Sequence, residues 1–151
     1  MAWLINKCNV TLNTENHIVS LPIHGSCLCG EIQFRINQTP TSVSICHCAT
    51  CRRAVGAGSV SWLTVARENL IFTKGKPQIF QSSAKVLRTF CGKCGSSLTY
   101  QSEDTPATID VTTSTISNPE DYPPTEEVWL SHQLPWEVAH KKIPKYLEDS
   151  P

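Results

Sequence analysis

Residues 45–53 read "ICHCATCRR" and place three cysteines, Cys46, Cys48 and Cys51, in a C-x-C-x-x-C pattern. Cysteines one or two residues apart rarely form disulfides with one another, because the geometry is strained. Their sulfurs can instead converge on one metal ion. Zinc in a closed structural site takes four protein ligands, whereas a catalytic zinc usually takes three and keeps one position open. This stretch therefore predicts a zinc centre whose fourth ligand decides its role.

Four further cysteines predict a second zinc centre. The turn "CGKC" (91–94) supplies Cys91 and Cys94, and "CLC" (27–29) supplies Cys27 and Cys29. Residues two apart on an extended strand point to the same side, so we expect the sulfurs of Cys27 and Cys29 to lie together. One ion bound by all four would join distant parts of the chain, which favours a closed, structural site.

Length and charge narrow the class of protein. The chain has 151 residues, which suggests one domain, and its 13 basic and 13 acidic side chains balance. We therefore expect no nucleic-acid partner, and no apolar run is long enough to predict a membrane span. The N-terminal 24 residues lack the apolar core of a signal peptide and are interpreted as an extension before a domain at 25–151. Seven of the eight cysteines lie in three tight clusters, which favours metal sites over disulfides and so a reduced, cytoplasmic location.

The rest of the pattern predicts a mainly β fold. Residues 30–36 alternate apolar and polar side chains, as a half-buried strand does. Segments rich in β-branched and aromatic residues predict further short strands; they are 59–65, 69–75, 78–82, 85–90, 96–100, 107–113 and 127–132, with one more near 3–10. Residues 49–56 could form a short helical turn, and 117–127 is a proline-rich acidic loop. We expect several short strands held together by zinc.

The fourth ligand at Cys46, Cys48 and Cys51 is left open by the sequence. Cys8, His47, His132 or His140 could complete a second structural site, although His47 should point away from its neighbours on a strand. Without a fourth ligand, three thiolates leave the zinc a mediocre activator of water but well suited to hold an external thiol as its thiolate. The reaction class predicted for the open site is attack by such a thiolate on a small electrophile, or the reverse reaction.

Two arginines, Arg52 and Arg53, follow the third cysteine directly. Guanidinium groups there would offset the anionic site and could hold a substrate carboxylate in a bidentate manner. A surface arginine pair with no role at the site is the alternative interpretation.

These motifs together resemble a known family. The segments "GSCLCGEIQF", "CHCATCRRAVGAG" and "RTFCGKCGSSL", with a late "PW", are similar to the glutathione-dependent formaldehyde-activating enzymes, a family that also contains centromere protein V. The resemblance covers residues 24–147 and implies coiled antiparallel β-sheets similar to those of B-type methionine sulfoxide reductases. It implies a structural zinc at Cys27, Cys29, Cys91 and Cys94. It also implies a catalytic zinc at Cys46, Cys48 and Cys51, with an open position that takes the glutathione sulfur.

The reaction that the resemblance implies joins formaldehyde to glutathione, giving S-(hydroxymethyl)glutathione, and is classed with the carbon–sulfur lyases. His47 and His132 are the candidates for the group that protonates the product oxygen. A non-catalytic, zinc-scaffolded interaction module is the main alternative, and it predicts a filled fourth position. A methionine sulfoxide reductase is disfavoured, because Cys8 is the only cysteine that the two zinc centres leave over.

Overall fold

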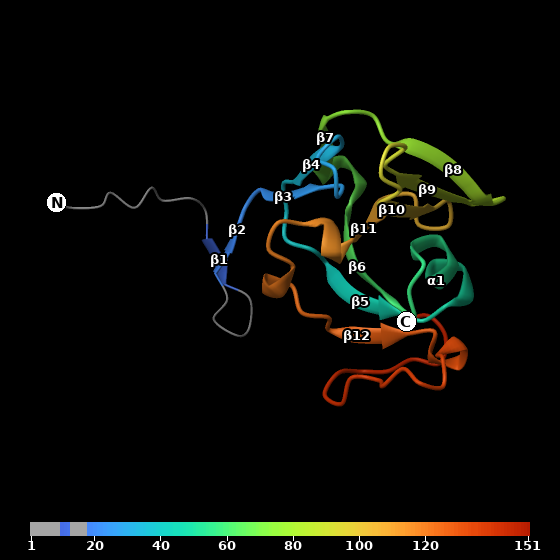
Figure 1. Cartoon of the computed structure of the whole chain (residues 1–151). Coiled ribbons are helices and arrows are strands. Elements are labelled where there is room, and N and C mark those ends of the chain that lie inside the picture. Colours follow the sequence, from blue (N-terminus) through green and yellow to red (C-terminus); the bar gives the residue numbers. More distant parts are fainter. Residues whose placement is uncertain (1–9, 13–17) are drawn as a thin grey trace.

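The computed structural model describes residues 10–12 and 18–151, and they form a mainly β structure (Figure 1). The strands are β1 (Val10–Leu12), β2 (Ile18–Ser20), β3 (Ile23–Ser26), β4 (Gln33–Ile36), β5 (Ser42–Cys46), β6 (Val60–Ala66), β7 (Leu70–Lys74), β8 (Gln78–Ser83), β9 (Val86–Phe90), β10 (Ser97–Ser102), β11 (Thr108–Thr112) and β12 (Glu126–Val128). One α-helix, α1 (Ala49–Val55), and 3-10 turns at Arg67–Asn69, Thr113–Thr115, Pro119–Asp121 and Leu130–His132 complete the described elements.

The described strands form three sheets. A seven-stranded sheet has the order β12-β5-β6-β11-β10-β9-β8, a three-stranded sheet has the order β3-β4-β7, and β1 pairs with β2. Neighbours in these sheets are antiparallel except β12 and β5, which are parallel. The predicted mainly β fold of short strands is confirmed, whereas the likeness to B-type methionine sulfoxide reductases stays a prediction.

Apolar alternation explains why these strands pack. On β4, Phe34 and Ile36 are buried while Gln33 and Arg35 are exposed, so one face meets the core. The main core joins this face to β6, β10 and β11; its fully buried members include Ile32, Phe34, Ile36, Leu63, Val65, Leu98 and Val111. A second, smaller cluster contains Cys46, Cys51, Val60, Trp62 and Val128, so two of the predicted zinc ligands lie within apolar packing.

The sequence missed or misplaced some elements. β3 and β5 were not among the predicted strands, because Gly25 interrupts the first and the second carries a mixture of serines and apolar residues. The strand predicted at 127–132 ends early, since Trp129 has φ 60° and a 3-10 turn follows it. The strand predicted near 3–10 lies outside the described residues except for Val10.

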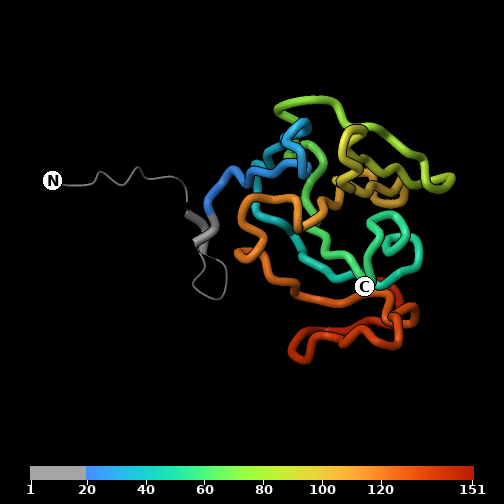
Figure 2. Tube along the Cα trace, viewed as in Figure 1, coloured from blue at the N-terminus to red at the C-terminus, as the bar shows by residue number. Residues whose placement is uncertain are grey.

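The C-terminal segment doubles back beside β12, as the red part of the tube in Figure 2 shows. Five backbone hydrogen bonds hold it there, from the N–H groups of Glu127, Trp129, Leu130 and Ser131 and of Tyr146 in the returning segment. The buried Glu127 carboxylate also accepts a bond of 2.9 Å from the His140 N–H. This return brings residues near the end of the chain to the neighbourhood of Cys46.

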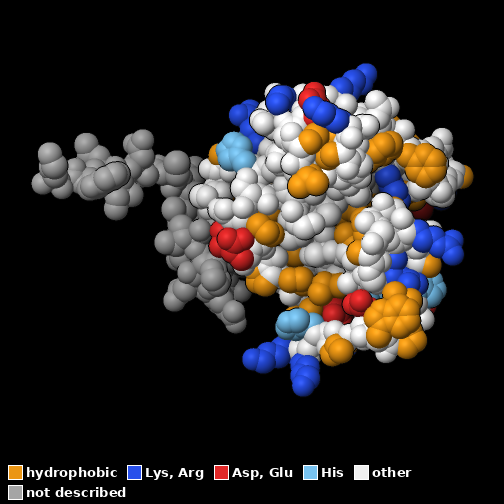
Figure 3. Space-filling model, viewed as in Figure 1, with side chains coloured by type: hydrophobic (Ala, Val, Ile, Leu, Met, Phe, Trp, Pro, Cys, Tyr) orange, Lys and Arg blue, Asp and Glu red, His pale blue; other side chains and the backbone are white. Residues whose placement is uncertain are grey.

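The surface shows no concentration of basic charge on the face drawn in Figure 3, where lysines and arginines lie in separate groups among polar and apolar side chains. Within the described part of the chain, no helix has the length and apolar character needed to cross a membrane.

Candidate metal centres and the hollow beside them

Four cysteine sulfurs from two distant turns meet at one place. The Sγ atoms of Cys27, Cys29, Cys91 and Cys94 all lie within 4.8 Å of one another. The Cys27–Cys29 and Cys29–Cys91 separations are 3.6 and 3.8 Å, far longer than a disulfide bond. Four sulfurs around a tetrahedral zinc at about 2.3 Å would lie about 3.8 Å apart. The cluster therefore has the dimensions of a four-thiolate metal site.

The local structure that brings Cys27 and Cys29 together is a turn and not the predicted strand. β3 ends at Ser26, and the Gly30 N–H then bonds the Cys27 carbonyl at 3.0 Å. The Ile32 N–H donates to the Cys27 sulfur at 3.3 Å. The strand prediction was wrong because the glycine at position 30, with φ 71°, lets the chain turn within "CLCG".

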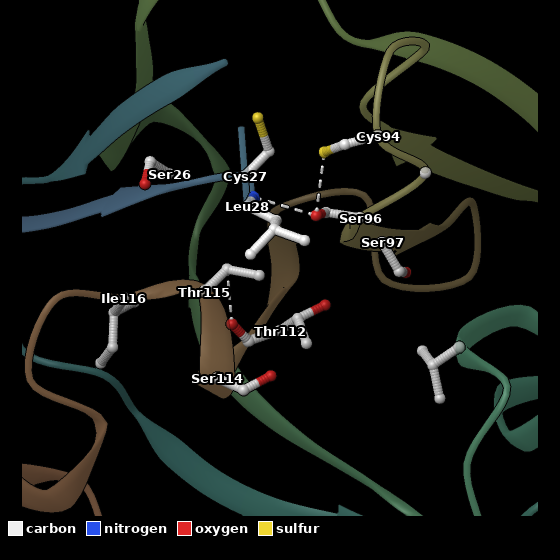
Figure 4. A pocket seen from close by; sticks show the side chains of 12 residues that line it. Ser26, Cys27, Leu28, Cys94, Ser96, Ser97, Thr112, Ser114, Thr115 and Ile116 are labelled. Carbon is white, nitrogen blue, oxygen red and sulfur yellow. Dashed lines mark hydrogen bonds between the residues drawn. The ribbon is translucent and has the colours of Figure 1, made fainter. Parts of the chain in front are cut away.

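The second turn follows the predicted form. Between β9 and β10, the Gly95 N–H bonds the Cys91 carbonyl at 2.8 Å, and Gly95 has φ 78°. Ser96 joins the two turns, since its hydroxyl accepts a bond of 3.0 Å from the Leu28 N–H and lies 3.3 Å from the Cys94 sulfur (Figure 4). The hydrogen bond with Ser96 lowers the pKa of Cys94 to about 5, which favours the thiolate that a metal requires.

A hollow of about 520 Å³ lies beside this cluster. Figure 4 shows its lining of small hydroxyl side chains, with Cys27 and Cys94 at one edge. The Thr115 hydroxyl donates a hydrogen bond of 2.7 Å to the Thr112 carbonyl, so its proton is not free for a ligand. Serine and threonine side chains there offer hydrogen bonds but no charge.

Three cysteine sulfurs meet at the junction of β5 and α1. Cys46 ends β5, Cys48 is the N-cap of α1, and Cys51 lies in its first turn. Their Sγ atoms all lie within 4.8 Å of one another. The Cys48 sulfur accepts a bond of 3.3 Å from the Cys51 N–H, so the helix cap itself fixes the relative position of two sulfurs.

The three thiols share protons unequally. Hydrogen bonds from the Cys46 and Cys51 thiols lower the pKa of Cys48, and the hydrogen bond to Cys48 raises the pKa of Cys46. Of these two thiols, Cys48 is therefore the one that loses its proton more readily. A bound metal ion would displace the remaining protons, so metal binding here must compete with protonation.

A hollow of about 390 Å³ opens beside these three sulfurs. Its other lining residues are Ser44, Ala49, Thr50, Trp62, Tyr100, Asp110, Val128, Trp129, His132 and Asp149. Trp129, in the left-handed region, stacks its ring on that of His132 with 5.5 Å between centroids. The cluster is thus accessible to a small molecule on its open side.

A row of directly paired residues crosses the large sheet beside this hollow. Arg88 on β9 pairs with Tyr100 on β10, Tyr100 with Asp110 on β11, and Asp110 with Thr64 on β6. Paired residues of neighbouring strands share one face of the sheet, so four polar groups lie side by side. Sequence reasoning did not identify this row, because strand register cannot be read from the sequence.

Two members of the row have unusual electrostatics. Burial raises the pKa of Asp110 to about 6, although the Thr64 hydroxyl donates to its Oδ1 at 2.7 Å. The buried Arg88 guanidinium lies 4.8 Å above the Tyr100 ring and donates to the Cys51 sulfur at 3.5 Å. A cation thus adjoins the thiolate cluster, and a carboxyl group that can hold a proton near neutral pH lies farther along the row.

The predicted alternatives for a fourth ligand lie in different places. His47 is buried against Glu127, with Nε2 3.8 Å from Oε1, as expected for a side chain that points away from its neighbours. His132 lines the hollow. Among the described residues, however, no histidine, cysteine or carboxylate joins the three sulfurs as a fourth ligand. His140 is exposed, and Cys8 lies outside the residues that the structure describes.

The predicted arginine pair occupies the outer side of α1. The Arg52 Nε donates to the His47 carbonyl at 2.9 Å, which ties the helix to the end of β5. Arg53 is exposed. Both line a hollow of about 420 Å³, which Leu134, Trp136 and Glu137 also line. This hollow shares Ala49 with the one beside the cysteines.

Comparison with known proteins agrees with these motifs. A crystal structure of a Rhodobacter sphaeroides protein superimposes with a TM-score of 0.55 at 19% identity, covering 81% of this chain and 98% of that one, and supports the fold alone. A Halomonas elongata protein named for glutathione-dependent formaldehyde activation is 29% identical over 84 residues, 50% of this chain and 54% of that protein. The match thus spans about half of that relative's length.

The family comparison covers most of the chain. The sequence profile described as "Glutathione-dependent formaldehyde-activating enzyme" matches residues 22–132, a span that contains both cysteine clusters, Arg88 and Asp110. The chain therefore belongs to the glutathione-dependent formaldehyde-activating enzyme family.

Proposed function

We propose that this protein is a zinc-dependent carbon–sulfur lyase that makes and breaks thiol adducts of a small aldehyde. The reaction that fits its family is formation of S-(hydroxymethyl)glutathione from glutathione and formaldehyde. The observation that carries the proposal is the group of Cys46, Cys48 and Cys51, whose three sulfurs lie together at the edge of a hollow large enough for a small substrate.

The two clusters would hold two zinc ions with different roles. Cys27, Cys29, Cys91 and Cys94 supply four sulfurs, a complete set for a structural ion. Cys46, Cys48 and Cys51 supply three, and no fourth ligand joins them from the described part of the chain. A zinc ion held by three thiolates binds an external thiol as its thiolate and so keeps a strong nucleophile available at neutral pH.

The chain's own residues would assist the chemistry around that sulfur. Carbon–sulfur bond formation moves an electron pair from the carbonyl bond to oxygen, which must then take a proton. Asp110, whose buried carboxyl has a pKa of about 6, and His132 both line the hollow and are the candidate donors. Trp62, Tyr100 and Trp129 surround the same space and would exclude water from it.

The hollow beside the arginine pair could hold the part of the substrate beyond its thiol. Arg52 and Arg53 line the hollow that adjoins the cysteine site at Ala49. We propose that they attract a substrate carboxylate, as guanidinium groups do. Arg53 is the more available of the two, because the Arg52 Nε is already bonded to the His47 carbonyl.

Metal analysis followed by calorimetric titration with glutathione tests the proposal. Two zinc ions per chain and saturable glutathione binding that is absent from a Cys51→Ser variant are expected. The control variant is Thr105→Ser, in an exposed turn away from both clusters. Two zinc ions with no thiol binding would contradict the proposal and favour the non-catalytic scaffold.

A further inference from the structure

Arg88 is a buried cation whose contacts do not use all of its donors. Only 6% of its surface is exposed. Its Nε donates to the Ser82 hydroxyl at 3.2 Å, and its Nη2 donates to the Cys51 sulfur at 3.5 Å. Its Nη1 is also buried, and no hydrogen-bond partner for it exists among the described residues.

This guanidinium also lacks a carboxylate partner. The ion pairs of the described chain are His47–Glu127, Lys85–Asp104 and Lys93–Glu31, and none of them includes Arg88. An arginine side chain stays charged at any physiological pH, and a buried charge is costly unless it is paired. The cysteine cluster provides a hydrogen-bond partner for one guanidinium nitrogen, Nη2. The free Nη1 therefore indicates a position where an anion from outside the chain would bind.

A separate hollow of about 430 Å³ adjoins Arg88. It is lined by Thr50, Arg53, Ala54, Phe80, Ser82, Arg88, Thr89, Phe90, Gly95 and Ser97. The lining combines two guanidinium groups and four hydroxyls with no carboxylate, which favours an anion. The two phenylalanine rings favour an organic anion over an inorganic one, because they can pack against carbon.

The position of this hollow links it to the cysteine site. It shares Thr50 with the hollow beside Cys46, Cys48 and Cys51, and Arg88 itself contacts Cys51. An anion held by Arg88 must consequently lie close to a sulfur held at the cluster. One extended residue spans about 3.3–3.6 Å, so a carboxylate one residue beyond a cysteine has a suitable reach.

We propose that this hollow is a carboxylate subsite, where Arg88 and Arg53 bind the carboxylate one residue beyond the cysteine of a peptide thiol. The inference rests on the proposed function, because it assumes that the thiol sulfur is held at the three-cysteine cluster. In glutathione this group is the glycine carboxylate. The subsite would select peptide thiols with a free carboxyl end over uncharged thiols.

Titration of the zinc-loaded full chain with glutathione and with its glycine ethyl ester tests the subsite. The ester blocks this carboxylate and leaves the thiol unchanged. We expect the ester to bind the wild-type chain about tenfold or more weakly, as for a lost charged hydrogen bond. In Arg88→Gln most of this difference in affinity between glutathione and its ester should be lost, with Arg53 contributing the remainder. The ratio of the two dissociation constants, ester over acid, should fall in part in Arg53→Gln. It should stay at the wild-type value in the exposed control Arg67→Gln.

The outcomes separate the two proposals. Equal affinities for acid and ester in the wild-type chain would overturn the subsite while leaving the thiol site intact. No saturable binding of either ligand would overturn the proposed function and the subsite with it. A folded Arg88→Gln with both metal ions and an unchanged ratio would remove Arg88 from the subsite. If Arg88→Gln does not fold, the ratio in Arg53→Gln decides, and an unchanged ratio there overturns the assignment.

Discussion

At the scale of single residues, the three thiols of Cys46, Cys48 and Cys51 are packed so closely that their Sγ atoms all lie within 4.8 Å of one another. In a core without a metal ion, ionising one of these thiols would leave a buried charge, which is energetically costly. This close packing is the arrangement that a metal ion requires, with Arg88 3.5 Å from Cys51 to offset the charge.

Replacing Cys51 by serine should remove one metal ion and leave the other. Cys51 belongs to the three-cysteine group and makes no contact with the four-cysteine group in the described residues. We expect one zinc per chain by elemental mass spectrometry, with a thermal midpoint within a few degrees of wild type. Two retained ions in a folded Cys51→Ser chain would contradict the assignment of this cluster.

Asp110→Asn should stabilise the protein, and more so at higher pH. The folded pKa of about 6 lies above the ordinary value of 3.8. The folded chain thus holds this proton more tightly, and stability contributed by the protonated form is lost as pH rises from about 4 through 6. Asparagine does not ionise, so the variant avoids this loss of stability. Its free energy of unfolding should exceed that of the wild type by about 3 kcal/mol at pH 7.5 and by about half as much at pH 5.

Urea denaturation of both chains at the two pH values measures this difference. Asparagine keeps the Oδ1 acceptor for the Thr64 hydroxyl, so the hydrogen bond at 2.7 Å is preserved. A stability difference that is the same at both pH values would show that the carboxyl of Asp110 is not desolvated as described.

At the scale of elements, the returning C-terminal segment completes the wall of the cysteine site. Pro144, Tyr146, Leu147 and Glu148 provide backbone carbonyls to β12 and to the turn after it, and Asp149 reaches the hollow beside the cysteines. The segment lies beyond the residues matched by the family profile, which end at 132.

Deleting residues 144–151 should destabilise the chain and weaken binding at the three-cysteine site. Five backbone hydrogen bonds would be lost, each worth about 0.5–1.5 kcal/mol. We expect a lower thermal midpoint and weaker glutathione binding by calorimetry. Deleting only 150–151, which make no backbone bond to β12, is the matched control. Equal thermal midpoints and equal affinities in the two truncated chains would contradict this role.

Local features were predictable at this scale, and long-range ones were not. The C-x-C-x-x-C pattern predicted the three-cysteine group because a few neighbouring residues determine which sulfurs meet. The four-cysteine group was predicted from two local pairs, C-x-C and C-x-x-C, because each supplies half of a complete set of zinc ligands. The alternation in 30–36 predicted β4 because it is likewise a local pattern. Arg88, Tyr100, Asp110 and Thr64 meet only through strand register. The sequence also gave no sign that the C-terminal segment would return to β12.

At the scale of the whole molecule, the four-cysteine cluster joins two sheets. Cys27 and Cys29 follow β3 of the three-stranded sheet, whereas Cys91 and Cys94 lie between β9 and β10 of the seven-stranded sheet. Direct strand pairing does not connect these sheets in the described residues. A bound ion would link them by a strong local bond and so stabilise the arrangement of the core between them.

Cys94→Ser should therefore cost much more stability than Cys51→Ser. Structural zinc contributes about 10–16 kcal/mol of binding free energy in small domains, so losing a ligand should lower the free energy of unfolding by several kcal/mol. Urea denaturation with zinc present, and again after a strong chelator, measures both effects. A Cys94→Ser chain as stable as wild type, or a chelator without effect, would contradict a structural ion here.

The central claim is that an external thiol joins the metal at Cys46, Cys48 and Cys51, and cobalt substitution tests it most directly. Cobalt(II) can replace zinc and absorbs light through its bonds to thiolate sulfur, so a fourth sulfur changes the spectrum. Titration with glutathione should raise the sulfur-to-cobalt absorbance saturably in the wild-type chain and not in Cys51→Ser. A wild-type spectrum that stays unchanged at millimolar glutathione would contradict the account.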